Sequence, residues 1–144
     1  MKITWLGHSC FTVESQGYRI VLDPYKDGTV PGLAPIRVEA DQVLCSHGHD
    51  DHCGTEGVSL RQGKLSPFTV ETIDTWHDDK KGALRGPNTL HILSDGQCRV
   101  AHLGDLGCDL TPYFNVDSMT TGVATSLSPD YPTHRTPGHS AKLQ

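Results

Sequence analysis

The chain has 144 residues, a length that indicates one domain and excludes a multidomain assembly. Hydrophobic residues make up 35% of it and charged residues 20%, which is typical of a globular protein and excludes a disordered or collagen-like one. Lys and Arg number 12 against 17 Asp and Glu, for a formal net charge of −5. This balance, with no clustered basic stripe, disfavours an extended nucleic-acid interface.

No run approaches the roughly 18 consecutive apolar residues of a membrane helix, and the opening MKITWLGHSCF lacks the features of a secretory signal. We therefore expect no membrane span and a cytoplasmic location. Cysteines are odd in number and widely spread, which predicts reduced thiols rather than a disulfide framework. Cys53 and Cys108 are interpreted as small apolar fillers. The five cysteines are Cys10, Cys45, Cys53, Cys98 and Cys108.

The first third of the chain predicts an antiparallel meander of three strands. Residues 3–6, 10–13 and 18–22 are rich in β-branched and aromatic side chains and are separated by short polar turns. Asp23-Pro24 ends the third strand, because proline cannot donate a hydrogen bond to a strand ladder. A loop marked by proline and glycine then runs to about Ile36.

The middle of the chain predicts further strands and one short helix. A short buried strand is expected at residues 43–46 and a helix within residues 55–62. Residues 68–76 alternate as a strand does. Residues 90–93 and 99–103 predict a hairpin, in which Asp95-Gly96 suits a type I′ turn.

The densest cluster of polar residues is His47-x-His49-x-Asp51-His52, which follows the predicted strand at 43–46. It places four candidate metal ligands within six residues of one loop. Neutral imidazole and carboxylate suit a borderline cation such as zinc, which in catalytic sites takes three protein ligands and a water. The motif therefore predicts a metal site at the end of a strand.

This motif matches in full the H-x-H-x-D-H signature of the metallo-β-lactamase superfamily. The chain resembles its branch of small metal-dependent hydrolases related to L-ascorbate-6-phosphate lactonase. The resemblance covers about residues 1–112 and implies an α+β fold, an αββα sandwich that is β-rich here and truncated in its C-terminal half. The further matching segments are Gly7-His8-Ser9-Cys10, Leu22-Asp23-Pro24, Trp76-His77-Asp78-Asp79, Arg85-Gly86-Pro87-Asn88 and His102-Leu103-Gly104-Asp105-Leu106-Gly107.

The resemblance implies a role for each matching residue. His47, His49 and His77 would hold a first metal ion, Asp51 and His52 would hold a second, and Asp105 would bridge the two. Asp51 and Asp105 would also act in catalysis by orienting the nucleophile. The implied cofactor is Zn²⁺, as one or two ions, with Mn²⁺ and Fe²⁺ as alternatives. His77 next to Trp76 could equally be a packing residue, and Asp105 in its Gly-Asp-x-Gly turn could equally be a turn-former.

Supporting roles are expected for residues near these ligands. His8 is interpreted as ordering its turn or supporting a ligand rather than binding metal directly. Asp23 is expected to accept an imidazole N–H and so fix a ligand tautomer. Four residues after His77 either border the substrate pocket or are solvated loop residues: Asp78, Asp79, Arg85 and Asn88.

Beyond Pro112 the sequence departs from the resemblance. Family members continue with a helix, a strand and a late histidine, whereas residues 113–144 are rich in Ser, Thr, Gly and Pro and predict an irregular, atypical tail. We expect a core at residues 1–112, with weaker occupancy of the second metal site unless His134 or His139 substitutes. Apolar faces of the core would stay exposed or pair with a second copy of the chain.

These features predict a metal-dependent hydrolase that uses a zinc-bound hydroxide on a small ester, lactone or phosphoester. The expected partner is a small-molecule substrate, with no nucleic acid and no membrane. The alternative is a truncated member that binds metal but is catalytically impaired. A diiron redox enzyme is disfavoured, because such enzymes usually carry Glu at the position of His49.

Overall fold

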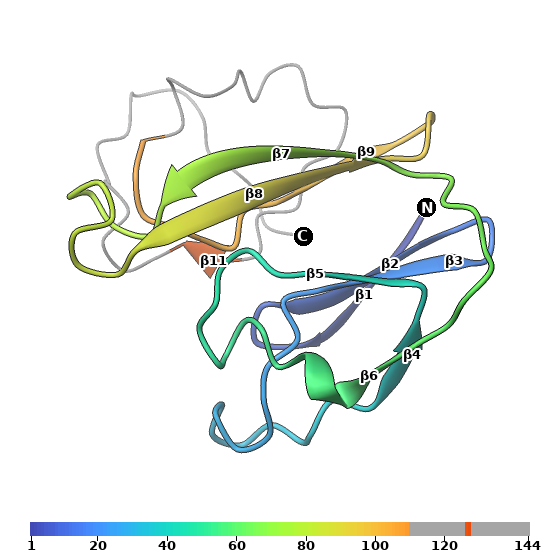
Figure 1. Cartoon of the computed structure of the whole chain (residues 1–144), viewed down its shortest axis with the longest axis horizontal. Coiled ribbons are helices and arrows are strands. Elements are labelled where there is room, and N and C mark those ends of the chain that lie inside the picture. The colour runs from blue at the N-terminus through green and yellow to red at the C-terminus, as the bar shows by residue number, and fades with distance from the viewer. Residues whose placement is uncertain (110–125, 128–144) are drawn as a thin grey trace.

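Two β-sheets make up most of the molecule (Figure 1), and the computed structural model describes residues 1–109 and 126–127. The first sheet has the strand order β1-β2-β3-β5, antiparallel except that β5 runs parallel to β3. The second has the order β7-β8-β9 and is antiparallel throughout. Their strands are β1 (Lys2–Gly7), β2 (Cys10–Ser15), β3 (Tyr18–Leu22), β5 (Gln42–Leu44), β7 (Thr69–Trp76), β8 (Pro87–Ser94) and β9 (Arg99–His102).

The main core lies between these two sheets. Successive side chains of a strand point to opposite faces, so Ile20 and Leu22 of β3 face this core while Val21 faces away from it. Phe68 and Leu93 pack against Ile20 and Leu22 from the side of the second sheet. The predicted meander is confirmed, with strand ends that differ by at most two residues.

A smaller pair of parallel strands covers the other face of the first sheet. It consists of β4 (Val38–Ala40) and β6 (Val58–Leu60), neither of which the sequence predicted. Val21 packs there with Tyr25, Ile36 and Ala40. Three-residue strands carry too few positions for a period to be recognised.

The prediction of a helix within residues 55–62 is wrong except for one short turn at residues 55–57. The structure has a 3₁₀ helix η1 (Thr55–Gly57) that leads directly into β6. Gly57 lies against the backbone of Ile36, where an added Cβ would collide with the Ile36 carbonyl oxygen. This close approach holds residues 58–60 beside β4, so tertiary packing overrides the local helical pattern.

The hairpin of β8 and β9 is confirmed, but its predicted type I′ turn is wrong. That turn requires positive φ at both Asp95 and Gly96, and only Gly96 has it, with φ 88°. Instead the Asp95 carboxylate accepts hydrogen bonds from the backbone N–H groups of Gln97 and Cys98, at 3.1 and 2.9 Å. The side chain of Asp95 therefore shapes the turn.

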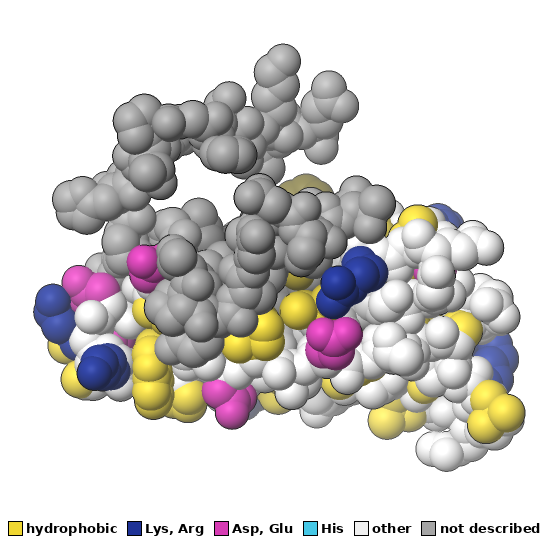
Figure 2. Space-filling model, turned by 90° about the horizontal axis from the view of Figure 1, so that it is seen from above, with side chains coloured by type: hydrophobic (Ala, Val, Ile, Leu, Met, Phe, Trp, Pro, Cys, Tyr) yellow, Lys and Arg dark blue, Asp and Glu magenta, His cyan; other side chains and the backbone are white. Residues whose placement is uncertain are grey.

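One part of the predicted irregular tail is a strand. Ser126–Leu127 forms β11, parallel to β10 (Asp105–Leu106). The rest of the tail, with His134 and His139, lies outside the described residues. On the face in Figure 2, seen from the side of the second sheet, basic and acidic side chains are interspersed with apolar ones. In the described ranges, no helix combines the length and apolar character that crossing a membrane requires.

Candidate metal centre

The candidate site lies where the end of β7 meets the loop after β5, at one end of the two sheets (Figure 1). We call residues 45–54, between β5 and η1, the ligand loop. Its glycine end packs so closely on the chain after β3 that a Cβ at Gly54 would collide with the backbone of Lys26. The N–H of Gly54 also donates to the carbonyl of Pro24 at 2.6 Å. The loop is thus fixed against the first sheet.

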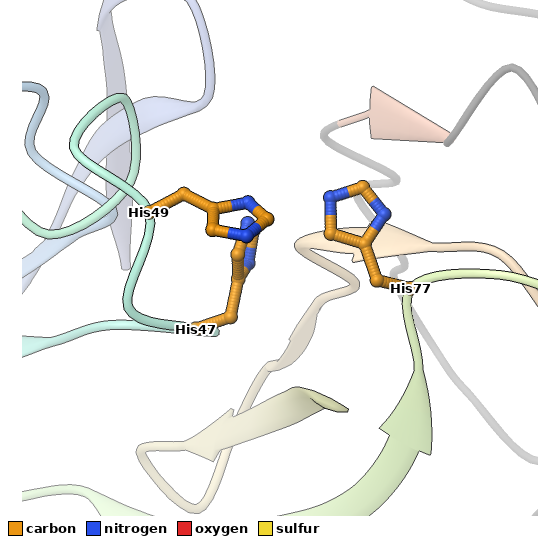
Figure 3. A group of neighbouring side chains, drawn as sticks. All are labelled: His47, His49 and His77. Carbon is orange, nitrogen blue, oxygen red and sulfur yellow. The ribbon is translucent and has the colours of Figure 1, made fainter. Parts of the chain in front are cut away.

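Three histidines from two separate segments of the chain face one another (Figure 3). His47 and His49 come from the ligand loop, and His77 follows β7. One ring nitrogen of each lies within 4.8 Å of the corresponding atoms of the other two. The residues that sequence reasoning assigned to the first metal are therefore brought together from segments far apart in the chain.

A second group contains His8, Asp51 and His52, whose candidate ligand atoms also lie within 4.8 Å of one another. Nε2 of His8 lies 3.2 Å from Oδ2 of Asp51, and Nε2 of His52 lies 3.7 Å from the same oxygen. His8 occupies the β1–β2 turn with φ 51°, as its predicted turn role requires. Its ring also contacts Asp51, the contact expected of a residue that supports a ligand, the other role that the sequence analysis gave to His8.

Asp105, the first residue of β10, lies between the two groups. Its Oδ2 is 3.1 Å from Nε2 of His77 and 3.3 Å from Nε2 of His52. The preceding Gly104 has φ 56°, and a Cβ there would collide with Ser46. Glycine at this position therefore lets β10 approach the ligand loop closely enough for Asp105 to reach both groups.

Asp23 is a fully buried acceptor behind the site. Its Oδ2 is 2.7 Å from Nδ1 of His52 and accepts the Ser46 hydroxyl at 2.5 Å, while Oδ1 accepts the Ser46 backbone N–H at 2.6 Å. The hydrogen bond to Nδ1 of His52 places Nε2 of that ring toward Asp105, at 3.3 Å from Oδ2. This is the tautomer-fixing geometry that sequence reasoning expected of Asp23.

Two buried histidines of the second sheet also contact this region, and sequence reasoning did not assign them roles. Nε2 of His102 lies 2.9 Å from Oδ2 of Asp23, and Nε2 of His91 lies 2.9 Å from the carbonyl of Cys45. His91 and His102 are paired across β8 and β9. Their signal in the sequence is a histidine flanked by apolar residues in each strand, at Leu90-His91-Ile92 and Ala101-His102-Leu103.

The electrostatics of the two loop histidines differ. Burial lowers the pKa of His47 to about 4, and the neighbouring His52 contributes to this shift. Burial also acts to lower the pKa of His52, but the carboxylates of Asp105 and Asp23 outweigh it and raise the pKa to about 9. For Asp23, burial acts to raise the pKa, but hydrogen bonds from His102, His52 and Ser46 outweigh it and lower the pKa below its usual range.

The donor set fits a divalent cation. Nε2 of His47 is buried, yet it has no hydrogen-bond partner among the described residues. An unpartnered polar atom in a protein interior is costly unless a ligand or ion satisfies it. His47 is also neutral at pH 7, so its lone pair is available, and three imidazoles with nearby carboxylates are the ligands that zinc accepts.

Cys45 and Cys53 form a disulfide, with a Cα–Cα distance of 5.5 Å. The expectation of reduced thiols and of an apolar filler role for Cys53 is therefore wrong for this pair. The curvature of the ligand loop brings its two ends together, and neither the number nor the spacing of the cysteines showed this. Cys10, Cys98 and Cys108 are free, as expected.

Asp78 and Asn88 are buried and fix the local backbone, so the interpretation as solvated loop residues is wrong for both, whereas a place at the border of the substrate pocket stays a prediction. The buried Asp78 carboxylate accepts backbone N–H groups from four residues of the following loop, namely Lys80, Gly82, Leu84 and Arg85. Buried Asn88 donates to the carbonyl of Leu103 at 3.0 Å and accepts the N–H of Asp105 at 3.1 Å. Both residues thus fix the backbone on which His77 and Asp105 lie.

Comparison with known proteins shows the family. The family model described as "Beta-lactamase superfamily domain" matches residues 2–130. The chain is 43% identical over 65 residues to a UPF0173 metal-dependent hydrolase from Carboxydothermus hydrogenoformans, which covers 44% of this chain and 29% of that protein. It is 30% identical over 130 residues to a UPF0173 protein from Pyrococcus furiosus, covering 73% of this chain and 60% of the relative.

A solved structure from Thermotoga maritima, a protein of the metallo-beta-lactamase superfamily, is similar at 31% identity and a TM-score of 0.49. That match covers 73% of this chain and 50% of the Thermotoga protein. The chain thus spans less than two thirds of the length of each of these relatives. Because the family model matches most of its residues, the chain belongs to the metallo-β-lactamase superfamily.

Proposed function

We propose that this chain carries the metal centre of a metal-dependent hydrolase. The observation that supports this most strongly is the convergence of His47, His49 and His77, with the buried Nε2 of His47 left without a hydrogen bond among the described residues. The similar protein of Carboxydothermus hydrogenoformans is named a metal-dependent hydrolase, which supports the same reaction class. The complete fold would be the αββα sandwich, to which the described residues contribute two sheets.

The proposed ligands fall into two sets. His47, His49 and His77 would hold one cation, while Asp51 and His52 would hold a second, with Asp105 placed between the sets. Zn²⁺ is the proposed metal because imidazoles dominate the set, and Mn²⁺ or Fe²⁺ would accept the same ligands. A bound Zn²⁺ supplies Lewis acidity and lowers the pKa of a coordinated water towards about 7.

The protein's own groups would orient the reaction. Asp105 is about four-fifths shielded from solvent and lies against His52 and His77, so its carboxylate can accept a proton from an attacking water and hold that water in place. Asp51 is more exposed and lies beside His8, where it can orient the same water from the solvent side. Asp23 would hold His52 in one tautomer while this occurs. We propose a small ester, lactone or phosphoester as substrate.

The test is metal content together with turnover. Protein purified without chelator should contain one or two equivalents of zinc by elemental spectrometry, and it should hydrolyse at least one generic lactone, ester or phosphodiester. His49→Ala should remove the first equivalent of zinc and abolish turnover, because it deletes one of the three proposed ligands. The His49 side chain is exposed, so its loss should have little effect on the core. Asp74→Ala, an exposed β7 residue, is the matched control and should change neither value.

Two outcomes of this test would change the conclusion. Zinc, manganese and iron contents that are all near zero in freshly prepared protein would contradict the proposal. Stoichiometric zinc without turnover on any of the three substrate types would instead support the alternative, a metal-binding member that is catalytically impaired.

A further inference from the structure

The ligand loop is closed into a covalent ring. The Cys45–Cys53 disulfide joins its two ends, with a sequence separation of 8 residues. Every candidate ligand that the loop contributes lies inside this ring: His47, His49, Asp51 and His52. Any chemistry at the disulfide therefore acts directly on the segment that would hold the metal.

We propose that Cys45 and Cys53 form a thiol–disulfide exchange site, at which small thiols and small disulfides set the metal affinity of the ligand loop. The oxidised pair holds the loop in its binding geometry, and the reduced pair loosens it. This inference rests on the proposed metal centre, and it adds a modification site and the chemical class of its reactant.

The noncovalent ties of the loop are uneven, which is why the disulfide matters. The His52 side is fixed by Asp23, at 2.7 Å, and by the contact between Gly54 and Pro24. The His49 side chain is exposed, and the ties near it run through the backbone: its carbonyl accepts the N–H groups of His52 and Cys53 at 2.9 Å each, and the carbonyl of Asp50 accepts the N–H of Lys26 at 2.8 Å. Breaking the ring therefore frees the part of the loop that carries His49 more than the part that carries His52.

Extra freedom in the unbound loop weakens metal binding. When a cation takes His47 and His49 as ligands, the loop loses the conformational freedom that it had in the metal-free protein. The free-energy cost of this ordering weakens binding. The closed ring removes much of that cost in advance. The first metal set, which uses both His47 and His49, should respond to the redox state more strongly than the second set.

Neither cysteine of the disulfide is buried. Cys45 and Cys53 are both partly exposed, whereas Cys10 is fully buried. Exchange requires a thiolate to reach one sulfur along the S–S axis, so a small reactant can attack here without unfolding the core. Cys98 and Cys108 are also partly exposed but are free thiols, which makes them internal controls.

The exchange is balanced with two equivalents of a low-molecular-weight thiol. The first thiol loses its proton and attacks one cysteine sulfur, the protein S–S bond breaks, and the departing cysteine takes up the proton. A mixed disulfide between the reagent and the protein remains. The second thiol attacks the reagent sulfur, releasing a small disulfide and the second cysteine thiol. The protein is reduced by two electrons and the small thiols are oxidised, and the reverse reaction consumes the small disulfide.

The experiment compares zinc affinity in the two redox states of the full chain. Protein is treated with oxidised glutathione or with reduced glutathione, freed of reagent under anaerobic conditions, and titrated with zinc against a competing chelator dye. Alkylation and mass spectrometry count the free thiols in each state. We expect reduction to expose two additional thiols and to raise the Kd for the first zinc about 10-fold, equivalent to about 1.4 kcal/mol. Reoxidation should restore the lower Kd.

Two variants locate the effect. Cys98→Ser/Cys108→Ser should keep the full redox response, while Cys45→Ser/Cys53→Ser should bind zinc like the reduced protein under both treatments. Equal or tighter zinc binding by the reduced wild-type protein would overturn the inference alone, and this result does not depend on any variant folding. Failure of oxidised glutathione to close the pair would overturn it too. Absence of zinc binding in both states would overturn the proposed function and the inference with it.

Discussion

The candidate metal centre has a buried half and an open half, and the two are held in different ways. In the buried half, His52 and Ser46 converge on Asp23, and none of these three side chains is appreciably exposed. In the open half, His8 and Asp51 retain about a third or more of their side-chain exposure, and they contact each other at 3.2 Å. Hydrogen bonds with the core therefore fix the buried half, whereas a bound cation would do most to order the open half.

This difference separates two kinds of residue that surround the same metal. Buried residues should control stability and metal binding together, because removing one leaves polar partners unsatisfied in the core. Open residues should control metal binding with little effect on stability, since water can replace their contacts. Substitutions in the two halves can test this division.

The largest effect should follow from Asp23→Asn. Asparagine tolerates the φ of 44° at this position, but it replaces a carboxylate that the Ser46 N–H, the Ser46 hydroxyl and His52 all approach. Breaking a buried charged network of this kind should lower the free energy of unfolding by about 3 kcal/mol. Urea unfolding of metal-free protein measures this loss, and zinc titration should show weaker binding as well.

Asp27→Asn is the matched control. Asp27 pairs with Arg37 at 2.6 Å on the surface, where water screens the interaction, so its free energy of unfolding should stay close to that of the unsubstituted protein. If Asp23→Asn and Asp27→Asn unfold at the same urea concentration, the buried half does not depend on its carboxylate, and the comparison between the halves fails.

An effect of intermediate size should appear as proton release. The pKa of His52 is raised to about 9 in the metal-free protein, by Asp105 and Asp23 against the effect of burial, so its ring is protonated at pH 7.5. A cation that binds Nε2 must displace that proton, whereas His47, with a pKa lowered to about 4, is already neutral. Calorimetric titration in buffers of different ionisation enthalpy should therefore show about one proton released per molecule at pH 7.5.

The pH dependence of stability should follow the same group. Because the folded-state pKa of His52 lies above its ordinary 6.5, its stabilisation of the metal-free fold is complete below about pH 6.5 and is lost as the pH rises through about 9. Proton release on zinc binding should disappear above that range. Release that is unchanged at pH 10, or zero at pH 7.5, would mean that His52 does not bind as the neutral ligand of the buried half.

The sequence predicted the parts of this site that depend on local pattern. Runs of β-branched and aromatic residues identified β2 and β3, alternation identified β7, and the spacing of His47 and His49 identified the ligand loop. It did not predict what depends on long-range packing. The roles of His91 and His102 arise because the second sheet packs on the loop, and the Cys45–Cys53 bond arises because the loop folds back on itself.

The smallest effect should follow from His8→Asn, and it tests whether the open half extends to the β1–β2 turn. Asparagine adopts the left-handed φ of 51° readily, so the turn and the free energy of unfolding should be preserved. Loss of the ring removes the contact with Asp51, and the Kd of the second cation should rise by about 10-fold, at the lower end of the range that supporting residues contribute. Gln16→Asn, at a second turn residue with positive φ, is the control for backbone effects. An unchanged Kd in His8→Asn would confine His8 to shaping its turn, and the open half of the centre would then consist of ligand-loop residues alone.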